Sequence, residues 1–201
     1  MRTAEVPFLK IEEVFAFRSS LTGETDRGCA LMAAAYLSDQ LEKLLRSLFV
    51  VAQQTVDRLF EPLGPAGSFS ARIDLAYACG LLPESAYNDL HLMRKIRNDF
   101  GHVAEPLTFD EPAIADRCHV LQHSVLEAKA RSRAKFTNAA LGVCAVIHAI
   151  TYTTRHRAVP QDFVWDEEKK SQVRDAANKL AAKILERLRM SDDGRTDKTH
   201  P

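Results

Sequence analysis

Apolar residues recur at helical spacing along almost the whole of this 201-residue chain, and no stretch shows the apolar–polar alternation of a strand. Glycine and proline interrupt the pattern, most firmly at residues 62–67 (PLGPAG). The sequence therefore predicts an all-α fold, a helical bundle of about six to seven helices. The expected helices cover residues 6–19, 27–61, 68–79, 83–101, 111–132, 133–155 and 165–190.

The length of the chain favours one domain, and 46% hydrophobic residues suffice for a packed core. We expect a single domain over residues 1–190 and a disordered polar tail over 191–201. The N-terminus shows no apolar signal segment, and no apolar run is long enough to span a bilayer. Cysteines that are far apart and form no CxxC pair indicate buried, reduced thiols. These features predict a cytoplasmic protein with no membrane partner. The cysteines are Cys29, Cys79, Cys118 and Cys144.

An arginine, an asparagine and a histidine stand together in the stretch RKIRNDFGH, residues 94–102. Arg97 carries a permanent charge and a forked donor that suits phosphate. His102 has a side chain that gives or takes a proton near neutral pH. Arg97, Asn98 and His102 are therefore the candidate catalytic residues, suited to act on a phosphodiester without a metal. On an ideal helix Arg97 and His102 lie roughly 140° apart, so either Gly101 ends the helix and turns His102 round, or two chains complete one site.

A structural role is the other interpretation of this stretch, and the spacing alone favours it. Cations are stabilised at the C-terminus of a helix. Asp99 is placed to pair with Lys95 or Arg94 on the same surface. In this interpretation Arg97 holds a buried partner such as Asp74 or Asp99.

Polar residues around the motif, and at the start of the helix 68–79, are candidate binding residues. His91 shares a line of the motif helix with Asn98 and His102. The helix that follows the Gly/Pro loop begins at Ser68 or Ser70, and its free N–H groups together with an arginine suit an anion, although simple serine capping is favoured. The candidate binding residues are Arg72, Asp74, His91, Arg94 and Asp99. The apolar stripe expected in the core is Leu90, Met93, Ile96 and Phe100.

Other kinds of site have weaker support. Asp116, His119 and His123 have a spacing that suits a metal, but no fourth ligand and no HExxH motif accompany them, so we expect no metal site. No phosphate-binding glycine loop, GxSxG or paired catalytic carboxylates are found, and we expect no cofactor.

The balance of 27 basic and 27 acidic residues argues against a protein that holds DNA through a basic surface. With no convincing helix-turn-helix either, we expect no direct reading of DNA. The best local candidate for contact with an RNA backbone is the cluster of Lys129, Arg131, Arg133 and Lys135.

Four phrases of the sequence together resemble the mannitol operon repressor family. They are RGCAL (27–31), GSFSARIDLAY (67–77), LHLMRKIRNDFGH (90–102) and IADRC (114–118). The resemblance gives the expected domain a family-like core over 27–132, followed by C-terminal helices over 133–190. It also implies control of transcription. Because no DNA-reading segment is found, such a repressor would act indirectly, through an unknown protein partner.

That family is similar to the HEPN group of all-α domains, in which an Arg-polar-(x)n-His motif is common. Many HEPN proteins are metal-independent ribonucleases that act as dimers, while others serve as regulators. The resemblance therefore implies an HEPN-like bundle, a homodimer and, as the alternative function, an endoribonuclease. In that enzyme His102 would move the proton, Arg97 would stabilise charge on the phosphate, and Asn98 would orient the histidine or the phosphate. We favour the regulator, with RNA as the alternative ligand, and leave open whether the chain is an enzyme.

Overall fold

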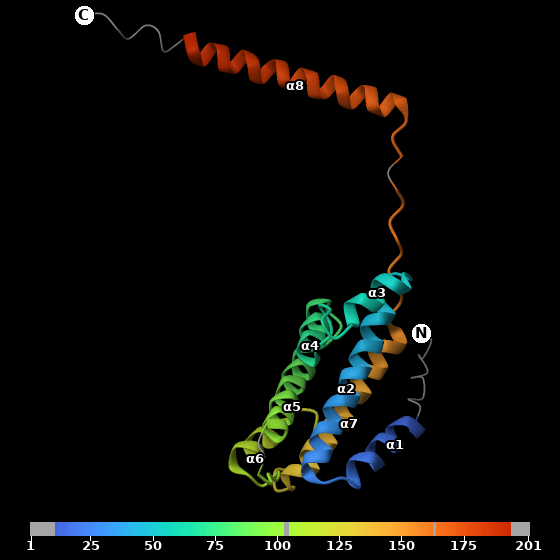
Figure 1. Cartoon of the computed structure of the whole chain (residues 1–201), viewed down its shortest axis with the longest axis vertical. Coiled ribbons are helices and arrows are strands. Elements are labelled where there is room, and N and C mark those ends of the chain that lie inside the picture. The colour runs from blue at the N-terminus through green and yellow to red at the C-terminus, as the bar shows by residue number, and fades with distance from the viewer. Residues whose placement is uncertain (1–10, 103–104, 163, 194–201) are drawn as a thin grey trace, which may run out of the picture. The chain divides into compact units, whose positions relative to one another are not determined.

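The structure is a computed structural model that describes residues 11–102, 105–162 and 164–193. All regular secondary structure in these residues is helical, which confirms the all-α prediction, and the helices number eight (Figure 1). The chain divides into two compact units, residues 1–158 and 159–201. The single domain expected over 1–190 stays a prediction.

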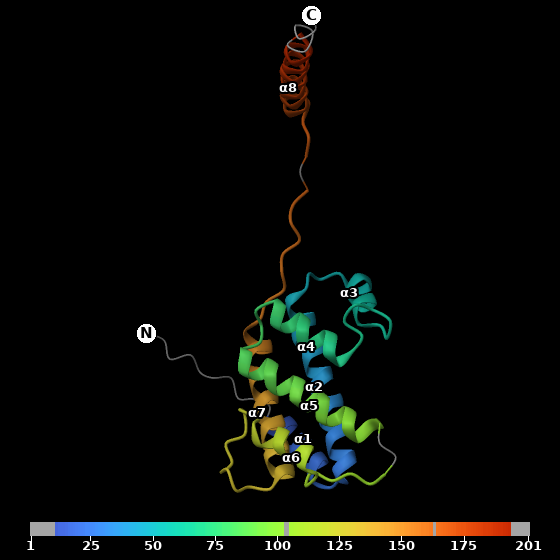
Figure 2. The ribbon, with the colours of Figure 1, turned by 90° about the vertical axis from the view of Figure 1, so that its left-hand side faces the viewer.

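Two long helices form the centre of the first unit. These are α2 (Asp26–Leu48) and α7 (Ser132–Thr153), which lie side by side in Figures 1 and 2. Against α2 also pack α1 (Ile11–Thr22), α4 (Phe69–Ala78) and α5 (Glu84–His102). In Figure 1, α4 and α5 lie on one side of α2 and α7, and α1 on the other. The predicted helix 6–19 is thus observed as α1, and residues 6–10 lie outside the described part.

The core of this unit is packed by small residues on α2 and by aromatic rings. The buried residues Ala30, Ala33 and Ala34 let other helices approach α2. Across the core, the ring of Phe109 lies 5.0 Å from that of Phe100 on α5 and 5.0 Å from that of Phe136 on α7. These tilted contacts tie α5 and α7 to the segment before α6 (Pro112–His119).

The single long helix predicted over 27–61 is wrong, because α2 ends at Leu48 and α3 covers Gln53–Phe60. The break contains neither glycine nor proline. Its cause is tertiary: the backbone N–H of Arg157 donates to the carbonyl of Leu48 (2.8 Å), and the ring of His156 donates to the carbonyl of Phe49 (2.6 Å). Carbonyls that would continue the helix are therefore satisfied by the chain that leaves α7.

The helix predicted over 111–132 is also too long, because α6 ends at His119 and residues 120–131 are irregular. The carboxylate of Asp89 on α5 accepts hydrogen bonds from the backbone N–H groups of Gln122 (3.0 Å) and His123 (2.8 Å). The carbonyl of His123 lies 2.5 Å from where Gly142 would carry a Cβ, so only glycine admits this approach. The hydrogen bonds to Asp89 thus hold residues 122 and 123 in a non-helical conformation.

Three of the four cysteines are buried, as predicted, whereas Cys79 is exposed where α4 ends. The prediction for Cys79 was wrong because α4 ends at Ala78, and Cys79 caps its exposed end instead of packing within the helix. Burial raises the pKa of Cys118 to about 12 and the pKa of Cys144 to about 11. These thiols therefore stay protonated at neutral pH.

Among the described helices, α7 alone is long and apolar enough to cross a membrane by length and composition. Its contacts with α1, α2, α5 and α6 give it the surroundings of a core helix. A helix that packs in a protein core can have this length and apolar composition without crossing a membrane.

The second unit is built on α8 (Glu167–Asp193), which agrees with the helix predicted over 165–190. Val173, Leu180 and Ile184 follow helical spacing and form an exposed apolar stripe along one face of it. Residues 191–193 of the predicted tail are helical, and 194–201 lie outside the described residues.

Candidate functional site

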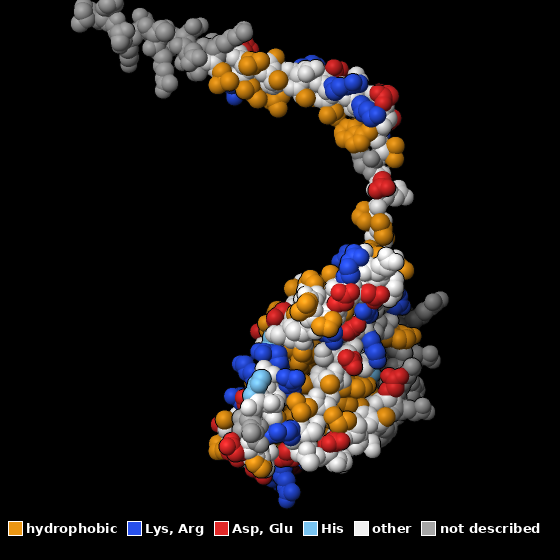
Figure 3. Space-filling view, in the orientation of Figure 1, with side chains coloured by type: hydrophobic (Ala, Val, Ile, Leu, Met, Phe, Trp, Pro, Cys, Tyr) orange, Lys and Arg blue, Asp and Glu red, His pale blue; other side chains and the backbone are white. Residues whose placement is uncertain are grey.

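The motif helix α5 separates an inner apolar face from an outer polar one. Leu90, Met93, Ile96 and Phe100 have no exposed surface, which confirms the predicted core stripe. The same helical period places Arg94, Lys95 and Arg97 on the outside. Figure 3 shows Lys and Arg side chains gathered around a histidine over α5.

Arg97 is exposed, and its Nη1 donates to Oδ1 of the neighbouring Asn98 over 3.1 Å. Neither acidic partner expected from the sequence binds it. Asp99 pairs instead with Arg117 of α6, and Asp74 pairs with His91 (3.1 Å). The guanidinium of Arg97 therefore keeps donors for a ligand.

His102 is the last residue of α5 and is exposed. Gly101 does not end the helix before it, so the first of the two geometric expectations is not met. Arg97 and His102 remain roughly 140° apart around the axis. Within one chain they do not face each other, and a shared site through a second chain stays a prediction.

A chain of hydrogen bonds links α4 to the outer face of α5. Nε2 of His91 bonds to Oδ1 of Asp74, and Nε of Arg94 donates to Nδ1 of His91 over 3.4 Å. Because Nδ1 accepts from Arg94, the ring proton resides on Nε2 and is donated to Asp74. The hydroxyl of Tyr87 also donates to Asp74 (3.3 Å), and desolvation followed by the Asp74 charge raises the pKa of Tyr87. Asp74, His91 and Arg94, all predicted as binding residues, are therefore brought together.

Arg94 and Arg97 line a hollow of about 650 Å³ between α2, α5 and the start of α4. None of its lining residues is acidic. Its apolar lining includes Leu31, Ala34 and Phe69. The polar lining is Ser38, Ser68, Ser70, Arg94, Arg97 and Asn98.

Arg72, another predicted binding residue, lies beneath this region with only 8% of its surface exposed. Its Nε donates to the carbonyl of Ala66 (2.9 Å), its Nη1 to Oγ of Ser38 (2.9 Å), and its Nη2 pairs with Glu42 (2.7 Å). Arg72 therefore joins α4 to α2 and to the Gly/Pro loop. Serine capping is also observed, since Oγ of Ser68 accepts from the N–H of Ala71 (3.1 Å).

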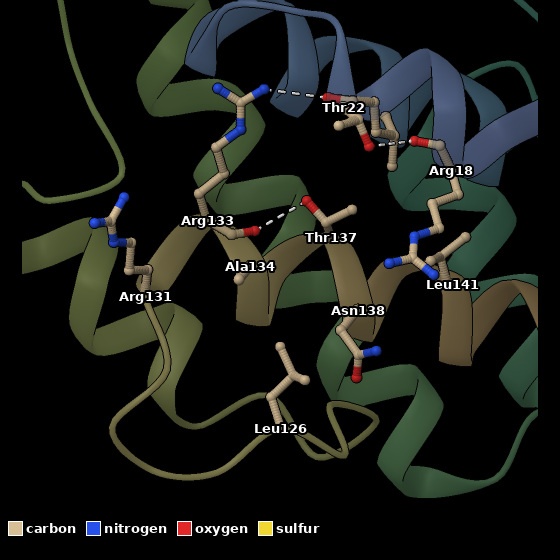
Figure 4. A pocket seen from close by; sticks show the side chains of 10 residues that line it. Arg18, Thr22, Leu126, Arg131, Arg133, Ala134, Thr137, Asn138 and Leu141 are labelled. Atoms are coloured by element: carbon tan, nitrogen blue, oxygen red, sulfur yellow. Dashed lines mark hydrogen bonds between the residues drawn. The ribbon is translucent and has the colours of Figure 1, made fainter.

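The predicted basic cluster does not form one open patch. Arg133 pairs with Asp26 (2.7 Å) and donates to backbone carbonyls at the end of α1, as Figure 4 shows in part. Lys135 is buried, and Lys129 pairs with Glu127 (3.1 Å). Arg131 is exposed at the rim of a hollow of about 340 Å³, whose lining includes Arg133.

Asp89 is a residue that the sequence analysis missed. Its carboxylate has no exposed surface and accepts from the ring of His123 (2.8 Å) as well as from two backbone N–H groups. His123 is thus bound to a structural carboxylate. No group of three potential metal ligands occurs in the part of the chain that the structure describes. The signal in the sequence was an aspartate on the apolar side of α5.

Comparison with known proteins agrees with the all-α fold and with the family resemblance of the sequence. A sequence profile described as "Mannitol repressor" (MtlR) matches residues 21–176. The chain belongs to the mannitol repressor family. Mannitol operon repressors of Escherichia coli strains K12 and CFT073 are each 27% identical to it over 96 residues, which are 46% of this chain and 49% of the relative. The chain thus matches about half the length of these curated relatives.

A solved member of the mannitol repressor family shares the fold. A chain in the X-ray structure of the MtlR–HPr complex from Escherichia coli superposes with a TM-score of 0.58 at 18% identity. The match covers 69% of this chain and 98% of that one. The similarity extends across nearly all of the solved chain, so the two chains share one fold.

Proposed function

We propose that this protein is a transcriptional regulator that acts through a protein partner and does not read DNA itself. The observation that carries the proposal is the match of the mannitol repressor family to residues 21–176, which include the whole packed core from α2 to α7. A family that controls transcription needs either a DNA-reading surface or a partner that has one.

The described helices lack the features of a DNA-recognition helix. A recognition helix must present several side chains outward to base edges. The pair α3 and α4 is joined by residues 61–68, a longer connection than the short turn of a helix-turn-helix. In α4 the charged side chain best suited to bases, Arg72, is buried against α2.

An HPr-type protein is the first partner to test, because the similar solved chain was crystallised with HPr. We further propose that the protein works in the cytoplasm as a homodimer. Calorimetric titration of the purified chain with HPr, and a gel-shift assay with fragments from its own operon, test the proposal. We expect saturable binding of the protein partner and only salt-sensitive, sequence-independent binding of DNA. A nanomolar shift of one operator fragment, lost on scrambling its sequence, would overturn the proposal.

The alternative is a metal-independent ribonuclease of HEPN type. The observation that favours it is the exposure of Arg97 and His102, since neither side chain is sealed by packing. Incubation of the chain with total RNA in the presence of a chelator tests this function. Cleavage that disappears in both His102→Ala and Arg97→Ala would establish it. Intact RNA at high protein concentration would exclude it.

A further inference from the structure

The hollow between α2, α4 and α5 combines cationic and hydroxyl groups without a carboxylate. We propose that it binds a small phosphate monoester that carries several hydroxyl groups. The proposal adds a small-molecule ligand to the regulator proposed above, and its test needs no protein partner.

The charge in the hollow comes from Arg94 and Arg97, which are three residues apart and therefore adjacent on α5. No carboxylate within hydrogen-bonding distance of either guanidinium is described. Arg94 donates through Nε to His91, and Arg97 through one Nη1 bond to Asn98. Each guanidinium has five N–H donors in a planar fork, so both keep most of them for an oxyanion. Two such forks side by side suit the doubly charged end of a phosphate monoester.

The remaining polar groups of the hollow suit hydroxyls. Ser38 and Ser68 already accept one hydrogen bond each, from Arg72 and from the backbone of α4, which leaves their own O–H groups free to donate. Asn98 accepts from Arg97 and keeps its amide N–H₂ group as a donor. A volume of about 650 Å³ is in the range that small-molecule sites occupy, about 300–1,000 Å³.

A chain of hydrogen bonds fixes one of the two arginines, Arg94. The hydrogen bonds from Arg94 to His91 and from His91 to Asp74 fix Nε of Arg94, so that its remaining donors are directed by α4 as well as by α5. A fixed guanidinium loses less freedom when a ligand binds. His91 is therefore a positioning residue, and Arg94 and Arg97 are the residues that touch the ligand.

Calorimetric titration of the full chain with inorganic phosphate, with mannitol 1-phosphate and with mannitol tests the proposal. We expect mannitol 1-phosphate to bind, inorganic phosphate to bind more weakly and to compete, and mannitol to give no signal. Arg94→Gln and Arg97→Gln should each weaken the binding of mannitol 1-phosphate about tenfold or more, since each removes charge-assisted hydrogen bonds. Lys95→Gln removes the same charge from the same helix outside the hollow, and it should leave binding unchanged.

The positioning role of His91 has its own pair of variants. His91→Ala removes the acceptor for Arg94, whereas His91→Asn retains an acceptor oxygen close to the position of Nδ1. We expect weaker binding in the first and recovery in the second, with equal melting temperatures. Equal binding by the two variants would remove the positioning role.

Three results would overturn the proposed site. One is no binding of either phosphate probe by the wild-type chain at millimolar concentration. Another is binding that Arg94→Gln and Arg97→Gln leave intact while their circular dichroism shows a native fold. The third is binding of a short single-stranded RNA through these arginines when mannitol 1-phosphate does not bind, which would assign the hollow to a nucleic acid. None of these results depends on whether HPr binds.

Discussion

Met93 and Arg94 are neighbours in the sequence, yet they lie on different faces of α5, about 100° apart around its axis. Met93 has no exposed surface, whereas Arg94 lines an open hollow. The inner side packs into the apolar core against α2, α4 and α7, and the outer side carries charged residues, of which Asp99 is paired with Arg117. The difference teaches that, along this helix, residues that belong to the core and residues that are open to a ligand are neighbours in the sequence.

Two arginines of the family phrases, Arg72 and Arg97, show the same contrast. Arg72 is almost fully buried and is hydrogen-bonded to Ala66, Ser38 and Glu42. Arg97 is exposed and donates only to Asn98 among the hydrogen bonds described for it. The same side chain serves packing in one place and is free for a ligand in the other, so the residue type alone does not indicate which.

The largest effect is expected where a charge enters the inner side. Met93→Asp should lower the free energy of unfolding by about 5 kcal/mol or more, because a carboxylate would be buried without a partner. Chemical denaturation of this variant, compared with Lys95→Asp on the outer side, measures the difference. A stable Met93→Asp protein would show that the two sides of α5 are not distinct.

The next largest effect concerns Asp89, a charge that belongs to the inner side. Asp89→Ala should cost about 3–5 kcal/mol, since it leaves the N–H groups of Gln122 and His123 without their acceptor. Hydrogen exchange should show opening at residues 120–131 first. Asn88→Ala, one residue earlier and exposed, is the control and should be neutral. Equal effects of the two variants would argue against Asp89 as the anchor of this segment.

A smaller loss is expected for Arg72→Met, which keeps the volume and removes the hydrogen bonds. We expect a loss of about 2–3 kcal/mol, because the carbonyl of Ala66 loses a buried donor and the partly exposed Glu42 loses one of its two arginines. Thermal melting beside the exposed Arg58→Met measures it. If Arg72→Met melted like the wild type, Arg72 would be available for binding as the sequence alone suggests.

The smallest effects on stability belong to the outer side. Arg97→Ala and His102→Ala should change the free energy of unfolding by less than about 0.5 kcal/mol, since both residues are exposed. Melting curves check this, and the same samples serve for RNA cleavage and for binding of mannitol 1-phosphate. A large drop in melting temperature would restore the structural interpretation of the motif.

The separation of inner and outer residues on α5 was predictable from the sequence. The apolar period of Leu90, Met93, Ile96 and Phe100 determines which residues are buried, whatever the neighbouring helices are. The Gly/Pro loop and Ser68 likewise predicted the start of α4. Local patterns of this kind need no knowledge of distant parts of the chain.

The breaks in the helices were not predictable in this way. The break after Leu48 depends on hydrogen bonds from the ring of His156 and from the backbone N–H of Arg157. The irregular segment after α6 depends on Asp89, which lies 33 residues before Gln122. Intrinsic helix propensities differ by little in free energy between most residues. A hydrogen bond from a distant residue can therefore decide where a helix ends.

The sequence by itself determined the all-α class, the inner face of α5 and the family, because these rest on periodicity and on ordered phrases of residues. Only the tertiary structure decided which charged residues are free. It paired Asp99 with Arg117 and Asp74 with His91, and it buried Arg72. The physical reason is that a charged side chain is satisfied by whichever partner the packing brings within hydrogen-bonding distance, and that distance is not encoded in the local sequence.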